Sequence, residues 1–133
     1  MILRDHVGNI IFSSCRYLFS CNDVLETEIM GIREGLSLAL QWSNLPIDVE
    51  SDNLEGVKMI LTGDMNRSKY AFLIEEIKAS LIERNSCITH VVRSKNNASH
   101  FLANFGRSQC RTVVWLGSGP DELLDIAGRD CNP

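Results

Sequence analysis

Residues 24–42 carry apolar side chains at spacings of three and four, and this pattern constrains the fold more than any other feature of the sequence. Such spacing puts the apolar side chains on one face of a helix. Asp23 supplies an N-cap with Glu26 three residues later, the spacing of a capping box, and Asn44 and Pro46 end the helix. The apolar stripe of the predicted helix consists of Leu25, Ile29, Ile32, Leu36 and Ala39.

Short apolar or alternating segments before and after this helix are typical of β-strands. Strands mixed with crossover helices favour an α/β fold, in which helices pack on a sheet. The expected strands span residues 1–4, 9–20, 47–52 and 87–92, and the further expected helices span 53–63, 70–84 and 96–106.

The composition indicates one folded domain that is neither secreted nor membrane-spanning. The chain has 133 residues, of which 44% are hydrophobic and 23% charged, so it can build a core and is not expected to be disordered. It contains no apolar run of about 18 residues, as a membrane span requires, and its first residues do not look like a signal peptide. The five cysteines show no paired spacing, which favours reduced thiols and an intracellular location, in the cytoplasm or nucleus.

The net charge is −4, but the charges are unevenly distributed. From Arg84 to Pro120 the chain has no acidic residue. Such a basic segment suits contact with phosphates, and it is equally compatible with a solvated surface of uneven charge. The basic residues of this segment are Arg84, Arg93, Lys95, Arg107 and Arg111.

Glu28 and Asp52 are the candidate metal ligands. Glu28 lies between the core positions Leu25 and Ile32 of the predicted helix, and a carboxylate there is costly unless it is paired or binds a cation. Asp52 ends a strand, at the edge of the sheet where α/β proteins bind ligands. The alternative is that Asp52 or Asn53 only caps the next helix. Two converging carboxylates would suit Mg²⁺ or Mn²⁺ and phosphodiester cleavage.

Three ordered motifs carry a resemblance to a known family. LETEIMGIREGLSLAL, IDVESD and ITHVVRSKNNASHFLANFGR together resemble the ribonuclease H-like domain of plant retroelement-derived, reverse-transcriptase-like proteins. The resemblance covers residues 1–107 and leaves 108–133 as a C-terminal tail. It implies a ribonuclease H-like mixed sheet of five strands with helices on both faces. It also implies endonucleolytic, magnesium-dependent hydrolysis of the RNA strand in RNA–DNA hybrids.

The resemblance implies four acidic site positions, which this sequence matches in part. Glu28 and Asp52 match the acids of the first helix and of the following strand. His100 stands where the fourth acid opens the last helix. The first acid belongs to an opening strand before the segment ILRD, so we expect a domain truncated at its N-terminus. Because that strand is central in the family sheet, its neighbours would lose partners and the chain would be marginally stable.

Further polar residues are candidates for nucleic-acid contact. Arg93 and Lys95, with Asn96 and Asn97, make a plausible loop for the phosphate backbone. His90 suits phosphate contact or product release, or is a strand residue whose ring is satisfied. Ser51 and Asn53 flank Asp52 and would reach a 2′-hydroxyl or a phosphate, unless they only cap the helix. His100 is a candidate metal ligand, although Mg²⁺ prefers oxygen.

Three functions follow for this sequence. The first is hydrolysis of RNA–DNA hybrids with Glu28, Asp52 and His100 as catalytic residues and Mg²⁺ or Mn²⁺ as cofactor. The second is a catalytically inactive domain that still binds nucleic acid, and the third is a scaffold remnant of a retroelement. The ligands of a two-metal site act as a unit. A sequence that retains two of the four acids is therefore better evidence of family membership than of activity.

Overall fold

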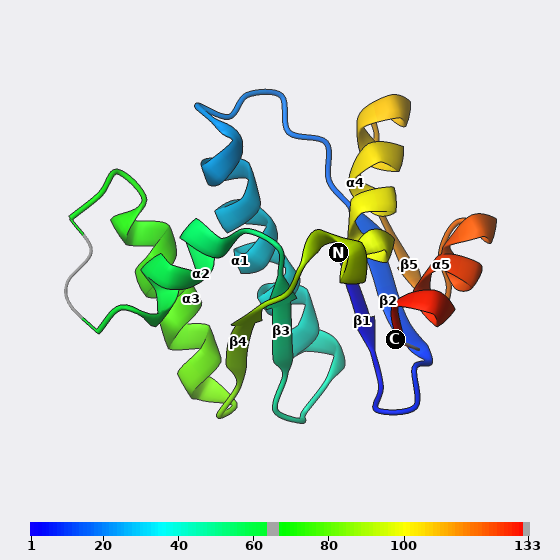
Figure 1. Cartoon of the computed structure of the whole chain (residues 1–133), viewed down its shortest axis with the longest axis horizontal. Coiled ribbons are helices and arrows are strands. Elements are labelled where there is room, and N and C mark those ends of the chain that lie inside the picture. The colour runs from blue at the N-terminus through cyan, green and yellow to red at the C-terminus, as the bar shows by residue number, and fades with distance from the viewer. Residues whose placement is uncertain (64–66, 132–133) are drawn as a thin grey trace. The chain divides into compact units, whose positions relative to one another are not determined.

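The computed structural model describes residues 1–63 and 67–131. Within this part, the chain forms five strands, five α-helices and a short 3₁₀ helix, η1 (Figure 1). The chain divides into two compact units, one of residues 20–91 and one of residues 1–19 with 92–133. In order, the elements are β1 (Ile2–Arg4), β2 (Ile10–Cys15), α1 (Val24–Trp42), β3 (Asp48–Ser51), α2 (Leu54–Leu61), α3 (Ala71–Glu83), β4 (Cys87–His90), η1 (Arg93–Lys95), α4 (Asn97–Gln109), β5 (Val113–Leu116) and α5 (Asp121–Cys131).

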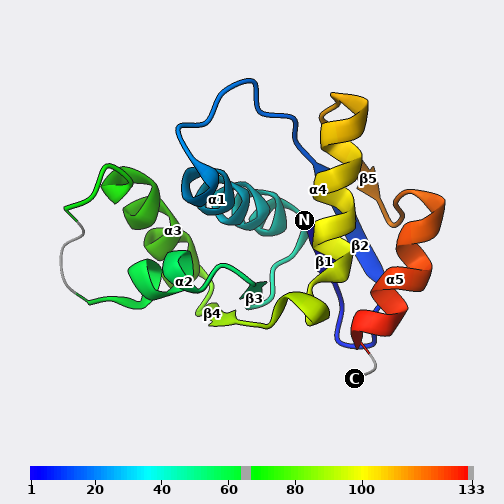
Figure 2. The ribbon, with the colours of Figure 1, turned by 45° about the horizontal axis from the view of Figure 1, so that its top comes forward.

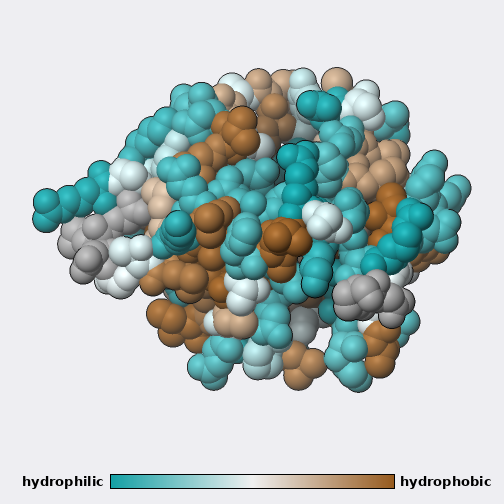
Figure 3. Space-filling model, viewed as in Figure 1, coloured by the Kyte–Doolittle hydropathy of each residue, from teal (hydrophilic) through white to brown (hydrophobic). Residues whose placement is uncertain are grey.

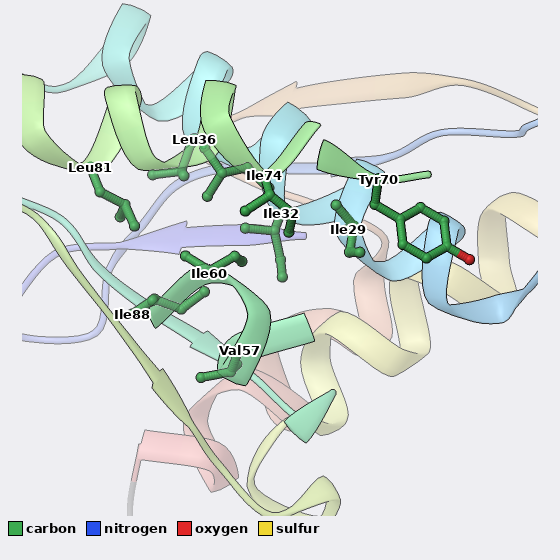
Figure 4. Packing of buried hydrophobic residues seen from close by; sticks show 10 residues of the cluster. Ile29, Ile32, Leu36, Val57, Ile60, Tyr70, Ile74, Leu81 and Ile88 are labelled. Atoms are coloured by element: carbon green, nitrogen blue, oxygen red, sulfur yellow. The ribbon is translucent and has the colours of Figure 1, made fainter. Parts of the chain in front are cut away.

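The unit of residues 20–91 packs α1, α2 and α3 with the parallel pair β3–β4 (Figure 2). The α1 bounds agree with the sequence prediction, and Asp23 caps the helix by accepting a 2.9 Å hydrogen bond from the Glu26 backbone N–H. Ile29, Ile32 and Leu36 of the predicted stripe are buried against α2 and α3, and Leu25 packs there partly buried (Figure 4). This core consists of Ile29, Ile32, Leu36, Val57, Ile60, Tyr70, Ile74, Ile77, Leu81 and Ile88.

The unit of residues 1–19 and 92–133 has a separate core. Its antiparallel sheet has the order β1-β2-β5, and α4 packs against both β2 and α5. Figure 1 shows α4 and α5 side by side, which agrees with these contacts. The buried residues of this core are Ala98, Leu102, Leu123 and Ala127.

The α/β class and the mixture of parallel and antiparallel strand pairs agree with the prediction and are compatible with a ribonuclease H-like fold. Two details differ. The five strands are divided between two sheets, and the segment expected to be a tail forms β5 and α5. In this segment the sequence shows an apolar cluster at 113–116 and favours only a final turn of helix at 121–127, because β5 has only four residues and α5 packs through few apolar positions.

The structure also describes the cysteines and the apolar character of the helices. In the described part of the chain, no helix combines the length and the apolar character of a membrane span. Cys15, Cys21, Cys87 and Cys110 are free cysteines, while the side chain of Cys131 lies outside the described residues.

Candidate functional site

Asp52 and His90 lie at the carboxyl ends of two paired parallel strands. Ser51, the last residue of β3, is the register partner of His90, the last residue of β4. The Val91 backbone N–H donates a 3.0 Å hydrogen bond to the Ser51 carbonyl oxygen, which continues the pairing beyond the strand. Asp52 follows Ser51 directly and is half-buried, whereas His90 is exposed. The structure therefore brings Asp52 and His90 to the edge at which α/β sheets bind ligands.

The helix cap after β3 is Asn53 and not Asp52. The Asn53 Oδ1 atom accepts a 2.7 Å hydrogen bond from the Gly56 backbone N–H. Ser51 is buried and stabilises the same turn, because its hydroxyl oxygen accepts a 3.2 Å hydrogen bond from the Asn53 backbone N–H. Local hydrogen bonds within this turn therefore account for Ser51 and Asn53.

Glu28 lies on α1 as the apolar spacing predicts. It is half-buried between Leu25, which packs against the core, and Ile32, which is part of the core. A Cβ atom added at Gly56 would lie 3.7 Å from the Ile29 side chain, so the first turn of α2 closely approaches the α1 turn that carries Glu28. Since α2 begins two residues after Asp52, both carboxylates belong to neighbouring turns of one unit.

Glu28 and Asp52 are the only carboxylates among the predicted site residues that could bind a metal. Among the residues that the structure describes, no group of three or more His, Cys, Asp or Glu side chains is arranged to hold a metal ion. Glu28 and Asp52 each have an interaction within the protein. Magnesium sites often contain only one or two protein carboxylates, with water and substrate phosphates completing the coordination. Two carboxylates fit that sparse kind of site but do not fit a closed protein cage.

The η1–α4 segment, which we define as residues 93–100, forms the second set of predicted site residues. Arg93 and Lys95 are exposed on η1, and His100 is exposed on the first turn of α4. The Arg93 Nη2 atom lies 2.9 Å from His100 Nε2 and 3.3 Å from Nδ1. A guanidinium group can only donate hydrogen bonds, so the imidazole nitrogen acts as the acceptor. His100 therefore holds Arg93 against α4.

The two asparagines of this segment have different surroundings. Asn96 is the N-cap residue of α4, but its side chain makes no capping hydrogen bond. The Asn97 amide donates a 2.6 Å bond to the Ser94 carbonyl and a 2.9 Å bond to Asp130 Oδ1. Asp130 was not predicted as a site residue. Its only sequence signal is an acidic side chain near the C-terminus of the chain, which does not reveal a partner 33 residues earlier.

Asp23 is the most strongly perturbed carboxyl group in the described part of the chain, and its role is structural. Its Oδ2 atom accepts a 2.6 Å bond from Lys69 Nζ and a 2.5 Å bond from the Tyr70 hydroxyl. These bonds, with that from Lys69 the larger cause, hold the pKa of Asp23 far below its usual range. The same pairing raises the pKa of Lys69. The cluster joins the N-terminus of α1 to the residues just before α3.

A shallow apolar groove between α2 and α3 is separate from the predicted site residues. Ile60, Leu61, Leu81 and Ile82 line it, with Leu61 63% and Ile82 76% exposed. Figure 3 shows hydrophobic residues at the surface over this part of the molecule. Groups suited to acid–base or metal chemistry are limited to Glu75 and Lys78, which are bonded to each other at 3.2 Å.

The predicted site residues are thus divided between the two units. Glu28, Ser51, Asp52, Asn53 and His90 belong to the unit of residues 20–91. Arg93, Lys95, Asn96, Asn97 and His100 belong to the unit of residues 1–19 and 92–133. Each set therefore lies within a single unit.

Comparison with known proteins tests the resemblance. No curated protein and no solved structure matches the chain significantly. Residues 1–106 match the family described as reverse transcriptase-like, almost the same range as the resemblance of residues 1–107. This match covers most of the chain and includes every predicted site residue. The chain therefore belongs to the reverse transcriptase-like family of ribonuclease H-like domains.

Proposed function

We propose that the chain binds RNA–DNA hybrids through the η1–α4 segment. The observation that carries this proposal is the pair of exposed cations Arg93 and Lys95, with Arg93 held by His100. No acidic residue occurs between Arg84 and Pro120 to offset them along the chain. Phosphate contacts from lysine and arginine supply most of the affinity in sequence-independent binding. The choice of a hybrid over other nucleic acids rests on the ribonuclease H character of the family.

Binding is tested by fluorescence anisotropy with a labelled RNA–DNA hybrid at several salt concentrations. Replacing Lys95 by alanine should weaken binding and reduce the slope of log K against log[salt] by about 1, the value for one lost phosphate contact. Lys58→Ala is the matched control, because Lys58 is also an exposed lysine but lies on α2. Failure of the chain to bind at low salt, or equal effects of the two substitutions, would contradict the proposal.

A second candidate function is metal-dependent cleavage of the RNA strand at Glu28 and Asp52. It is favoured by the position of Asp52 directly after β3, at the carboxyl end of the parallel pair β3–β4. Mg²⁺ or Mn²⁺ would be held by these two carboxylates and by substrate phosphates, and when bound it would activate water and stabilise the leaving oxygen. We assign His100 to binding rather than to the metal, because its ring nitrogens face the Arg93 cation.

Cleavage is tested separately from binding, with an end-labelled hybrid and added Mg²⁺ or Mn²⁺. Asp52→Asn should abolish metal-dependent cleavage, whereas Glu55→Gln should not, because Glu55 is exposed on the adjacent turn of α2. Binding without cleavage would restrict the function to a nucleic-acid-binding domain. Cleavage that survives Asp52→Asn would refute the role of these carboxylates.

A further inference from the structure

The C-terminal helix α5 reverses the charge of the chain next to its most basic part. After the acid-free stretch that ends at Pro120, α5 contains four acidic residues and one basic residue, Arg129. This helix lies beyond the family match, which ends at residue 106. The acidic residues of α5 are Asp121, Glu122, Asp125 and Asp130.

Packing and hydrogen bonding fix the position of α5 against α4. Leu123 is fully buried and Ala127 is 4% exposed, and both pack with Leu102 of α4. The Arg4 Nη1 atom donates a 3.0 Å hydrogen bond to the Ala127 carbonyl oxygen, which ties α5 to β1. Asp130 therefore approaches α4 from a defined direction.

The Asp130 carboxylate takes two hydrogen-bond donors from the η1–α4 segment. Its Oδ1 atom accepts a 2.9 Å bond from Asn97 Nδ2, and its Oδ2 atom accepts a 2.8 Å bond from the Ala98 backbone N–H. The first donor belongs to a residue that the sequence singles out for phosphate contact. A carboxylate that accepts two N–H bonds resembles a phosphate group in charge and in acceptor geometry.

We propose that Asp130 is an autoinhibitory contact: its carboxylate occupies donors of the η1–α4 segment that a nucleic-acid phosphate would use. The inference rests on the proposed binding of hybrids and concerns the regulation of that same segment. In the structure the Asp130 carboxylate holds the Asn97 amide and the Ala98 backbone N–H. A bound hybrid displaces the carboxylate, so part of its binding free energy is lost in breaking these bonds.

The test compares Asp130→Asn with Asp125→Asn in the full chain, again by anisotropy with a labelled hybrid. The two substitutions remove the same charge from the same helix, but Asp125 is exposed. Asp130→Asn should tighten binding at low salt by about fivefold, because it weakens the competition for these donors and removes a charge that repels phosphate. Asp125→Asn should change affinity by less than about twofold, because its charge is screened.

A second measurement does not depend on the folding of a variant. In the NMR spectrum of the unaltered chain, hybrid binding should shift the Ala98 amide and the Asp130 side-chain carboxyl resonance. If both stay unchanged while the hybrid binds, or if Asp130→Asn binds no more tightly than the unaltered chain, Asp130 merely caps α4 and the inference is overturned. If neither the unaltered chain nor Asp130→Asn binds a hybrid, the proposed function itself fails.

Discussion

Gly106 should be indispensable for the packing of α4 on β2, although alanine is the better helix former. A Cβ atom added at Gly106 would lie 2.8 Å from the Cβ and 3.2 Å from the Sγ of Cys15, and 3.5 Å from the Arg111 carbonyl oxygen. Cys15 is only 4% exposed and belongs to β2. Because the closest atom is a Cβ, a rotamer change cannot relieve the contact, and the helix and strand backbones must separate.

The expected magnitude follows from two opposing effects. Replacing glycine by alanine inside a helix normally stabilises it by about 0.5–1 kcal/mol. Forcing an additional methyl group into a packed interior costs about 1–3 kcal/mol. The cost of the clash should exceed the gain in helix propensity, so Gly106→Ala should lower the free energy of unfolding of its unit by about 1–2 kcal/mol. Gly31→Ala is the control, since an added Cβ there meets no atom within 4 Å and should stabilise α1.

The assay can follow each unit separately because each contains one of the two tryptophans. Trp115 lies on β5, and Phe105 contacts its ring edge-on with centroids 5.6 Å apart, whereas Trp42 ends α1. Urea unfolding of Trp42→Phe and Trp115→Phe backgrounds therefore reports one unit at a time. The reasoning is refuted if Gly106→Ala stabilises the Trp115 signal, or if Gly31→Ala and Gly106→Ala shift their midpoints in the same direction.

Three further predictions concern the cores and the perturbed groups. Ile74→Ala should destabilise only the unit of residues 20–91, and Leu102→Ala only the unit of residues 1–19 and 92–133. Each should lower the free energy of unfolding by about 2–5 kcal/mol in urea, because both side chains are fully buried. An equal loss in both units would refute separate cores. Hydrogen bonds from a lysine and a tyrosine lower the pKa of Asp23, so its stabilising effect is present above the unfolded pKa of about 3.9 and is lost as the pH falls toward the folded value. In Asp23→Asn, the free energy of unfolding should therefore change less as the pH is lowered than it does in the unaltered chain. The 3.0 Å bond from the Cys87 thiol to Asp48 raises the thiol pKa, so Asp48→Asn should speed alkylation of Cys87 at pH 8, and an unchanged rate would exclude this coupling.

The helix of residues 24–42 was predictable because its determinants are local. The apolar stripe, the Asp23 cap and the break at Asn44 and Pro46 all lie within or beside the helix. The structure reproduces both ends, Val24 and Trp42. The division of the strands into two sheets was not predictable in this way, because partners are set by contacts such as that between β2 and β5, about 100 residues apart along the chain.

The candidate site shows the same division between local and distant determinants. Asp52 is predictable from its place after a strand, but the choice between Asp52 and Asn53 as cap depends on backbone angles and on the position of the Gly56 N–H. Asp130 has no local signal at all, because its partners Asn97 and Ala98 lie more than 30 residues earlier.

The position of Asp130 bears on position 100, where the resemblance leads us to expect an acid and the chain has His100. Considered alone, the histidine only removes a carboxylate from the start of α4. In the structure, however, the ring of His100 accepts from Arg93, and a carboxylate from α5 bonds to the first turn of the same helix. An aspartate at position 100 would place a second carboxylate on the turn of α4 that already binds Asp130, and two neighbouring carboxylates repel each other. His100 and Asp130 are thus compatible neighbours, because an imidazole ring, unlike a carboxylate, does not repel the acid that α5 supplies. The double variant His100→Asp with Asp130→Asn should accordingly be more stable than His100→Asp alone, whereas additive effects would show that the two positions are independent.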